Sequence, residues 1–123
     1  MFATLQCVVL DCPNPAALAA FYHSLLGGTV DLADPRWSLD ENWSTLHTPT
    51  GFVLAFQRVS PYHPPQWPDP SRPQQFHLDS EVTDLDRAHT EALTCGATPL
   101  DTTANRWRVY ADPAGHPFCL VHH

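Results

Sequence analysis

The two halves of this chain carry the same order of secondary-structure signals, and this repeat constrains the fold more than any other feature. Each half is expected to run strand, helix, strand, strand, strand. The first half predicts strands at residues 5–10, 29–32, 42–48 and 52–59, and the second predicts strands at 74–82, 98–100, 106–111 and 117–121. One such unit cannot bury both its sheet face and its helix stripe, whereas two units sharing a curved sheet can.

The two predicted helices have clear starts and ends. Asn14 followed by Pro15 predicts the first helix start, and Gly27 predicts its end, because glycine accepts the left-handed cap conformation without penalty. A capping-box-like segment, 83–86, predicts the second start, and Gly96 its end. Apolar residues recur every three or four positions within the first helix, at Leu18, Phe21, Tyr22, Leu25 and Leu26. The second helix repeats this stripe at Leu85, Ala88, His89, Ala92 and Leu93.

Residue similarity supports the repeat and divides the chain. The segment 25–32 resembles 93–100, and 51–56 resembles 115–120. Between the halves, residues 60–73 hold six of the 13 prolines, which favours an ordered, extended loop over a helix or a central strand. We therefore predict a single domain built from module one (1–59), a proline-rich loop (60–73) and module two (74–123).

Composition excludes several classes of protein. The chain has only six Lys and Arg residues and a formal charge of −7, so neither nucleic acid nor an anionic membrane surface is an expected partner. It lacks an apolar run of the ~18 residues that a membrane span needs. The four cysteines include no C-x-x-C pair, which predicts free thiols and a cytoplasmic protein. Whether the terminal His122 and His123 are native is open.

The predicted strand 74–82 carries the clearest chemistry. Its alternation places Gln75, His77, Asp79 and Glu81 on one face. His77 and Asp79 are same-face neighbours, so we predict a histidine–carboxylate pair in which His77 acts as a general base near neutral pH. The alternative is a structural histidine that forms a hydrogen bond with a neighbouring group.

Several segments together resemble the vicinal oxygen chelate superfamily, which comprises glyoxalase, bleomycin-resistance and extradiol-dioxygenase proteins. They are the run 7–10, the helix from Phe21–Tyr22 to Leu26–Gly27, the strand at His77 with 82–86, and the closing segment 112–118. The resemblance covers nearly the whole chain. It implies an α+β fold of two βαβββ modules forming a cupped eight-stranded mixed sheet with helices outside, and a homodimer.

The resemblance also indicates where metal-using members of this superfamily place their ligands. The four positions fall on Cys7, Ala55, His77 and Cys119. The histidine is present, but the two carboxylates are absent and an alanine occupies one position. A metal-free site is therefore the favoured prediction. If a metal binds, we expect zinc held by Cys7, His77 and Cys119, because thiolates are soft ligands.

Aromatic residues supply the candidate ligand contacts. Trp43 and Trp107 lie on predicted strands that line the cavity in this fold, and Tyr62 and Trp67 lie in the proline-rich loop. Gln57 lies two residues beyond Ala55 on the same strand face and offers an amide. A concave apolar pocket with few polar groups is typical of small-molecule sites, although buried core packing is the ordinary role of such aromatics.

Two functions of different classes follow. The favoured one is a protein that binds a small hydrophobic or aromatic molecule without a catalytic metal. The alternative is a lyase or isomerase of the glyoxalase type that uses His77, with zinc as a cofactor. A module retained for association with a partner is a third possibility. The identity of the ligand, and whether one chain or a dimer completes each cavity, stay open.

Overall fold

A computed structural model of the protein describes residues 1–37 and 40–123. The chain divides into two compact units, Met1–Tyr62 and His63–His123. The division falls inside the proline-rich loop. Each unit is described by itself.

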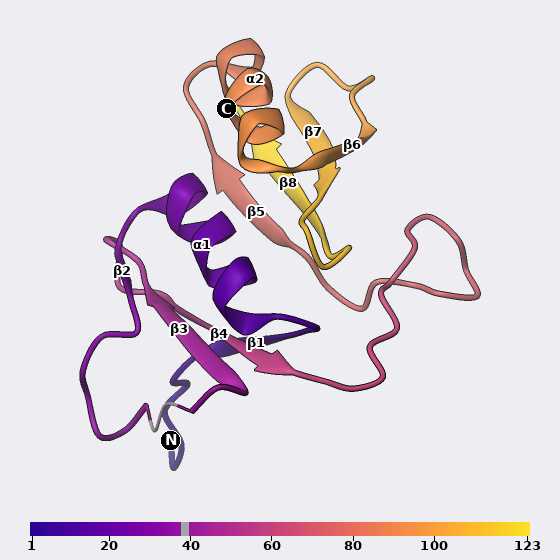
Figure 1. Ribbon diagram of the computed structural model, residues 1–123. Helices are drawn as coiled ribbons and strands as arrows, with labels where there is room; N and C mark the ends of the chain where they lie inside the picture. Colours follow the sequence, from indigo (N-terminus) through magenta and orange to yellow (C-terminus); the bar gives the residue numbers. More distant parts are fainter. Residues whose placement is uncertain (38–39) are drawn as a thin grey trace. The chain divides into compact units, whose positions relative to one another are not determined.

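The first unit is a four-stranded mixed sheet with one helix packed on one face (Figure 1). The strand order is β1-β4-β3-β2, in which β1 runs parallel to β4 and the other pairs are antiparallel. The elements are β1 (Val8–Cys12), α1 (Pro15–Leu26), β2 (Thr29–Val30), β3 (Trp43–His47) and β4 (Val53–Arg58).

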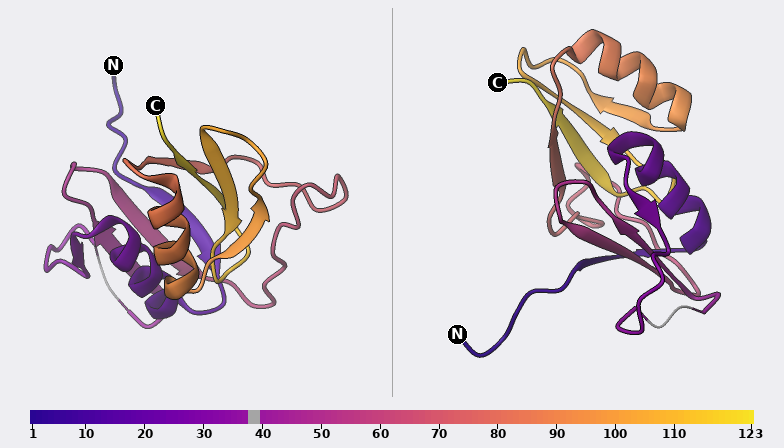
Figure 2. Two further views of the ribbon diagram at one scale, coloured as in Figure 1. Left: turned by 90° about the horizontal axis from the view of Figure 1, so that it is seen from above. Right: turned by 90° about the vertical axis from the view of Figure 1, so that its left-hand side faces the viewer.

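The second unit repeats this topology. Its strand order is β5-β8-β7-β6, with β5 parallel to β8. Each helix lies along one face of its own sheet in all three views (Figures 1 and 2). The elements are β5 (Leu78–Glu81), α2 (Leu85–Cys95), β6 (Thr98–Asp101), β7 (Trp107–Ala111) and β8 (Pro117–Val121). The α+β class and the two βαβββ modules are thus confirmed, with four strands in the sheet of each unit.

Helix α1 forms as its sequence predicts. The Asn14 side chain accepts a hydrogen bond from the backbone N–H of Ala17 at 3.1 Å, and Pro15 occupies the first turn. Leu18, Phe21 and Tyr22 of the apolar stripe are buried, whereas Leu25 and Leu26 are half-buried. Tyr22 stacks on Phe56 of β4 with ring centroids 5.8 Å apart. Gly27 caps the helix, and its N–H donates to the carbonyl of His23. Its φ of +74° is positive, as predicted, but its ψ of −157° differs from the predicted left-handed helical conformation.

Helix α2 begins differently from the predicted capping box. Asp84 is the cap, because its carboxylate accepts a hydrogen bond from the N–H of Arg87 at 3.1 Å. Asp86 accepts a hydrogen bond from Arg108 of β7 at 2.7 Å. Its carboxylate therefore links the helix to the sheet and does not complete a capping box. A capping box needs a side chain long enough to reach back to the cap residue, and Asp is one methylene shorter than Glu.

Two strands have different limits from those predicted. β1 begins at Val8 and continues through Asp11 to Cys12, because these residues pair with β4 up to Arg58. β5 begins only at Leu78, opposite Phe118. The preceding residue on β8 is Pro117, which has no N–H to donate, so the ladder is not extended toward residue 74. Periodicity does not reveal a strand's partner, and the partner decides both limits.

Gly28 and Gly115 allow close approaches of the chain. A side chain at Gly28 would put its Cβ 2.1 Å from the carbonyl oxygen of His47, and the backbone there has φ +91°. A Cβ at Gly115 would lie 2.9 Å from Cβ of Pro64, so the proline-rich loop packs on the turn before β8. Within this loop, backbone hydrogen bonds close turns between Gln66 and Arg72.

The structure bears on two predictions made from composition, namely the state of the cysteines and the absence of a membrane span. None of the four cysteines, all of which lie in the described part of the chain, forms a disulfide, as expected. Among the described residues, neither helix has the length and apolarity that crossing a membrane requires.

Candidate functional site

The face of the second sheet opposite α2, here called the helix-free face, carries the predicted chemical residues. Tyr110 of β7 lies on the other face, where its hydroxyl contacts Nδ1 of His89 in α2 at 2.8 Å. Side chains alternate along a strand, so the neighbours of Tyr110 along β7 point away from the helix. The strand registers extend this alternation across the sheet. They place Asp79 beside Cys119 and Val109, and Glu81 in line with Val121 and Trp107.

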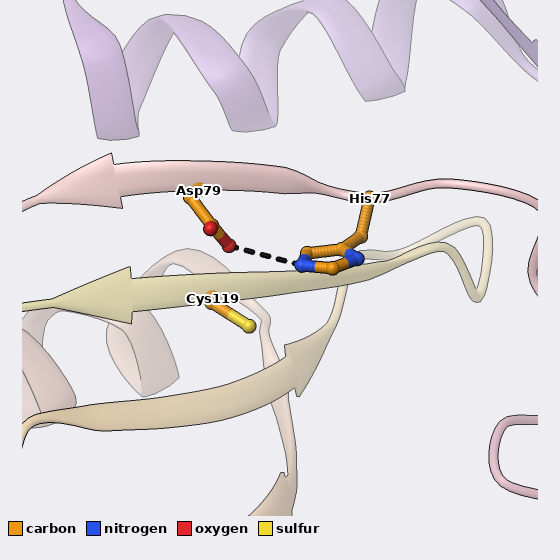
Figure 3. A group of neighbouring side chains, drawn as sticks. All are labelled: His77, Asp79 and Cys119. Atoms are coloured by element: carbon orange, nitrogen blue, oxygen red, sulfur yellow. Dashed lines mark ion pairs between the residues drawn. The ribbon is translucent and has the colours of Figure 1, made fainter.

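Three side chains of the helix-free face form a polar cluster (Figure 3). Nε2 of His77 lies 3.1 Å from Oδ1 of Asp79. One ligand-type atom of each of His77, Asp79 and Cys119 lies within 4.8 Å of the others. The histidine and the carboxylate project from the start of β5 and approach the thiol on the neighbouring β8. The predicted pairing of His77 with Asp79 therefore exists in the structure.

The environment of Cys119 disfavours its thiolate. The pKa of this thiol is raised to about 11, first by burial and then by the negative charge and the hydrogen bond of Asp79. Cys119 is therefore a protonated thiol at neutral pH. It is a weak nucleophile unless a cation binds beside it.

A cavity of about 260 Å³ opens at the cluster. Its lining is His77, Asp79, Trp107, Cys119 and Val121. Trp107 is 50% exposed although it lies on a strand of the sheet. The cavity thus joins an apolar wall of Trp107 and Val121 to a polar wall of the other three residues.

The structure brings four of the predicted site residues together, namely His77, Asp79, Cys119 and Trp107. The sequence did not identify Val121, or Asp79 as a partner of Cys119. The spacing of two residues between His77 and Asp79 was a usable signal. The contact with Cys119 depends on the parallel register of β5 on β8, which no local pattern gives.

The first unit holds further positions that the sequence singles out for the site. Trp43 of β3 is half-buried and pairs with the exposed Gln57 of β4. Ala55 is fully buried between Val9 and Thr45. Cys7 lies next to the start of β1, and burial raises the pKa of its thiol. These side chains occupy the positions in their sheet that correspond to those of the second-unit site.

The two aromatic residues of the proline-rich loop are half-buried. Tyr62 ends the first unit, and Trp67 lies in the turn closed by Gln66 and Arg72 of the second. Their roles as ligand contacts stay predictions. Trp37, in contrast, is a core residue that packs edge-on against the ring of His47 with centroids 5.3 Å apart.

The donor set of the cluster fits one kind of metal better than others. An imidazole, a carboxylate and a thiol suit zinc, whereas manganese and magnesium prefer oxygen ligands. Zinc bonds of 2.0–2.3 Å would place the ligand atoms roughly 3.3–3.8 Å apart, so the side chains would have to close in slightly. His77 and Asp79 have side chains that are 40% and 61% exposed, and they have room to do so.

Paired βαβββ modules, with polar groups on the helix-free face of a mixed sheet, define a protein of the vicinal oxygen chelate superfamily. Comparison with family models gives the particular family. Residues 7–121 match the model of the glyoxalase-like domain, and the chain belongs to this family. No protein of curated function matches the chain.

Solved structures share the fold at low identity. A glyoxalase/dioxygenase from Nostoc punctiforme is 19% identical with a TM-score of 0.74, over 97% of this chain and 90% of that one. A glyoxalase/bleomycin resistance protein/dioxygenase family enzyme from Burkholderia phytofirmans PsJN is 18% identical with a TM-score of 0.71, over 98% of both chains.

The fosfomycin resistance protein FosX from Listeria monocytogenes is a further structural neighbour. It is 12% identical with a TM-score of 0.72, over 100% of this chain and 95% of that one. A FosX variant was solved with Mn(II) and 1S,2S-dihydroxypropylphosphonic acid. At these identities the likeness concerns the fold.

Proposed function

We propose that this protein binds a small hydrophobic or aromatic molecule in the cavity on the helix-free face, without a catalytic metal. The observation that carries this proposal is the half-exposed indole of Trp107 on the wall of a cavity that also holds polar groups. Apolar walls with a few placed polar groups are typical of small-molecule sites.

The size of the cavity limits the ligand. A cavity of roughly 150 Å³ takes up benzene in other proteins, so about 260 Å³ accommodates a single substituted ring. Stacking of such a ring on Trp107 contributes about 0.5–1.5 kcal/mol beyond the burial of its area. His77 and Asp79 then orient a polar substituent.

The other predicted contacts extend the same proposal. Trp43 and Gln57 correspond in their sheet to Trp107 and Val121, and we propose that they contact a ligand as well. We propose the same for Tyr62 and Trp67 of the loop, and a homodimer as the assembled form. Replacing each of these residues singly and measuring ligand affinity tests each contact.

Titration with single-ring aromatics, followed by the indole N–H signals in ¹H–¹⁵N NMR spectra, tests the principal proposal. The Trp107 signal, assigned from a Trp107→Phe variant, is expected to shift, and Trp107→Leu is expected to weaken binding more than tenfold. Phe52→Leu is the matched control, because Phe52 is also an exposed aromatic residue (73%) but lies in a turn of the first unit. Unchanged affinity in Trp107→Leu would contradict the proposal.

The polar cluster favours a second candidate, a zinc-dependent lyase or isomerase. His77, Asp79 and Cys119 would hold the ion, with Cys7 as the further ligand predicted from the sequence. Zinc would supply a Lewis acid for a substrate oxygen. In an enzyme that works without the ion, Asp79 would hold Nε2 of His77, and Nδ1 would be the atom that accepts a proton.

Metal analysis separates the two candidates. The protein is purified without added metal, and its zinc content is measured for the wild type and for His77→Ala and Cys7→Ser. The binding proposal predicts no stoichiometric zinc. One tightly held zinc per chain that is lost in His77→Ala would establish the second candidate, and the Cys7→Ser result would show whether that thiol takes part. Cobalt substitution gives an independent readout, since a sulfur-to-cobalt charge-transfer band reports a thiolate ligand.

A further inference from the structure

The helix-free face of the second sheet is acidic. Asp79 and Glu81 project from β5 on this face. The arginine of β7, Arg108, lies on the opposite face, where its guanidinium donates to the carbonyl of Leu85 and to the carboxylate of Asp86 in α2. Alternation along β7 places Arg106 with Arg108 and not with Trp107. Of the residues that the structure places on the strands of this face, none is Lys or Arg.

The two walls of the cavity both attract positive charge. The carboxylate of Asp79 lies 3.1 Å from Nε2 of His77, but it is 61% exposed and supplies a negative charge at one side. The indole of Trp107 is half exposed at the other, and the face of an indole ring carries negative electrostatic potential that attracts cations within about 6 Å. An anionic ligand would meet unfavourable potential from both.

We propose that the cavity selects small organic cations, of the class of aryl and aralkyl amines, with the ammonium group between Asp79 and Trp107. This inference rests on the proposed binding function and names its ligand class. The volume of about 260 Å³ admits one ring with a short amine arm. Val121 and the remaining indole surface receive the ring.

A series of three ligands that differ in charge tests the proposal. Benzylamine, benzyl alcohol and benzoate share one ring and carry a positive, a zero and a negative charge at neutral pH. Their affinities are measured by NMR titration of the full chain in the presence of a chelator. We expect benzylamine to bind about tenfold tighter than benzyl alcohol, which corresponds to about 1.4 kcal/mol, and benzoate to bind more weakly than either.

Two charge-removing variants locate the effect. Asp79→Asn is expected to reduce the affinity for benzylamine to that for benzyl alcohol. Glu91→Gln removes one negative charge from α2 of the same unit, where Glu91 pairs with Arg87 at 3.2 Å, and is expected to leave the preference unchanged. The chemical shifts of the core signals check that both variants fold.

The outcomes separate the proposed ligand class from the proposed binding function. Equal affinity for the amine and the alcohol, or a preference that survives in Asp79→Asn, would overturn the selection of cations and leave the binding function standing. Failure of all three ligands to bind would remove the proposed binding function and this inference with it.

Discussion

Trp43 and Trp107 occupy the same position in the two modules. Each opens the third strand of its unit, and each pairs with a residue two positions beyond the equivalent sites Ala55 and Cys119. Their environments differ, because Trp43 is half-buried beside Gln57, whereas Trp107 is 50% exposed beside Val121. The repeat thus supplies a tryptophan at the same position of each sheet, and Trp107 is the more accessible to a ligand.

Replacement of Trp107 is expected to affect binding far more than stability. Trp107→Leu removes the exposed ring, so affinity for aromatic ligands falls more than tenfold. The free energy of unfolding changes by about 0.5–1 kcal/mol, because half of the side chain is already in water. Urea denaturation gives the stability, and NMR titration gives the affinity. A loss of several kcal/mol would instead identify Trp107 as a core residue.

The thiol of Cys119 is expected to react slowly below pH 9. Because its pKa is raised from 9.0 to about 11, the folded protein binds the thiol proton more tightly than the unfolded chain. The resulting stabilisation is fully present below about pH 9 and is lost as the pH rises toward 11. Iodoacetamide labelling followed by mass spectrometry should show that the labelling rate of Cys119 in the folded protein rises up to about pH 11. In urea-unfolded protein, the rate should level off at a lower pH.

Asp79→Asn tests the cause of this shift. Asp79 contributes through its charge and its hydrogen bond, and burial is the larger cause. The pH at which labelling of Cys119 levels off is therefore expected to fall without reaching that of the unfolded chain. An unchanged profile would show that the carboxylate does not act on the thiol.

Two glycines offer a matched pair for stability. Gly28→Ala would place a Cβ 2.1 Å from the carbonyl oxygen of His47, whereas a Cβ at Gly51 meets nothing within 4 Å. Both have positive φ, of +91° and +96°. Gly51→Ala is thus expected to cost about 1–2 kcal/mol for the backbone conformation alone. Gly28→Ala should cost several kcal/mol more in urea denaturation, and equal losses would contradict the close approach at His47.

The hydrogen bond between Tyr110 and His89 is expected to fix α2 on its sheet. The hydroxyl of Tyr110 is on a fully buried residue, and Nδ1 of His89 lies 2.8 Å from it. Tyr110→Phe should lower the free energy of unfolding by about 1–3 kcal/mol, because Nδ1 of His89 would lose its hydrogen-bond partner at a partly buried position. A double-mutant cycle with His89→Ala measures the coupling, and additive losses would show that the two side chains act independently.

Local sequence patterns predicted the elements, and pairing across strands decided the details. The helix limits at Asn14 and Gly27 follow from capping chemistry, which involves neighbours in the chain. The strand limits at Val8 and Leu78 follow from β4 and β8, which lie far away in sequence. The same holds for the site. His77 and Asp79 were paired by their spacing, but their approach to Cys119 required the register of β5 on β8.

The parallel register of β5 on β8 also has a consequence for how such proteins diverge. Side chains alternate between faces with a period of two, so a single-residue insertion or deletion before Leu78 that shifts β5 by one position would turn Leu78 and Ser80 toward the cavity and hide His77 and Asp79 under the helix. Descendants of this sequence can therefore lose the chemistry of this strand through a shift of one position in its register, and the same shift would remove Leu78 from the helix side of the sheet.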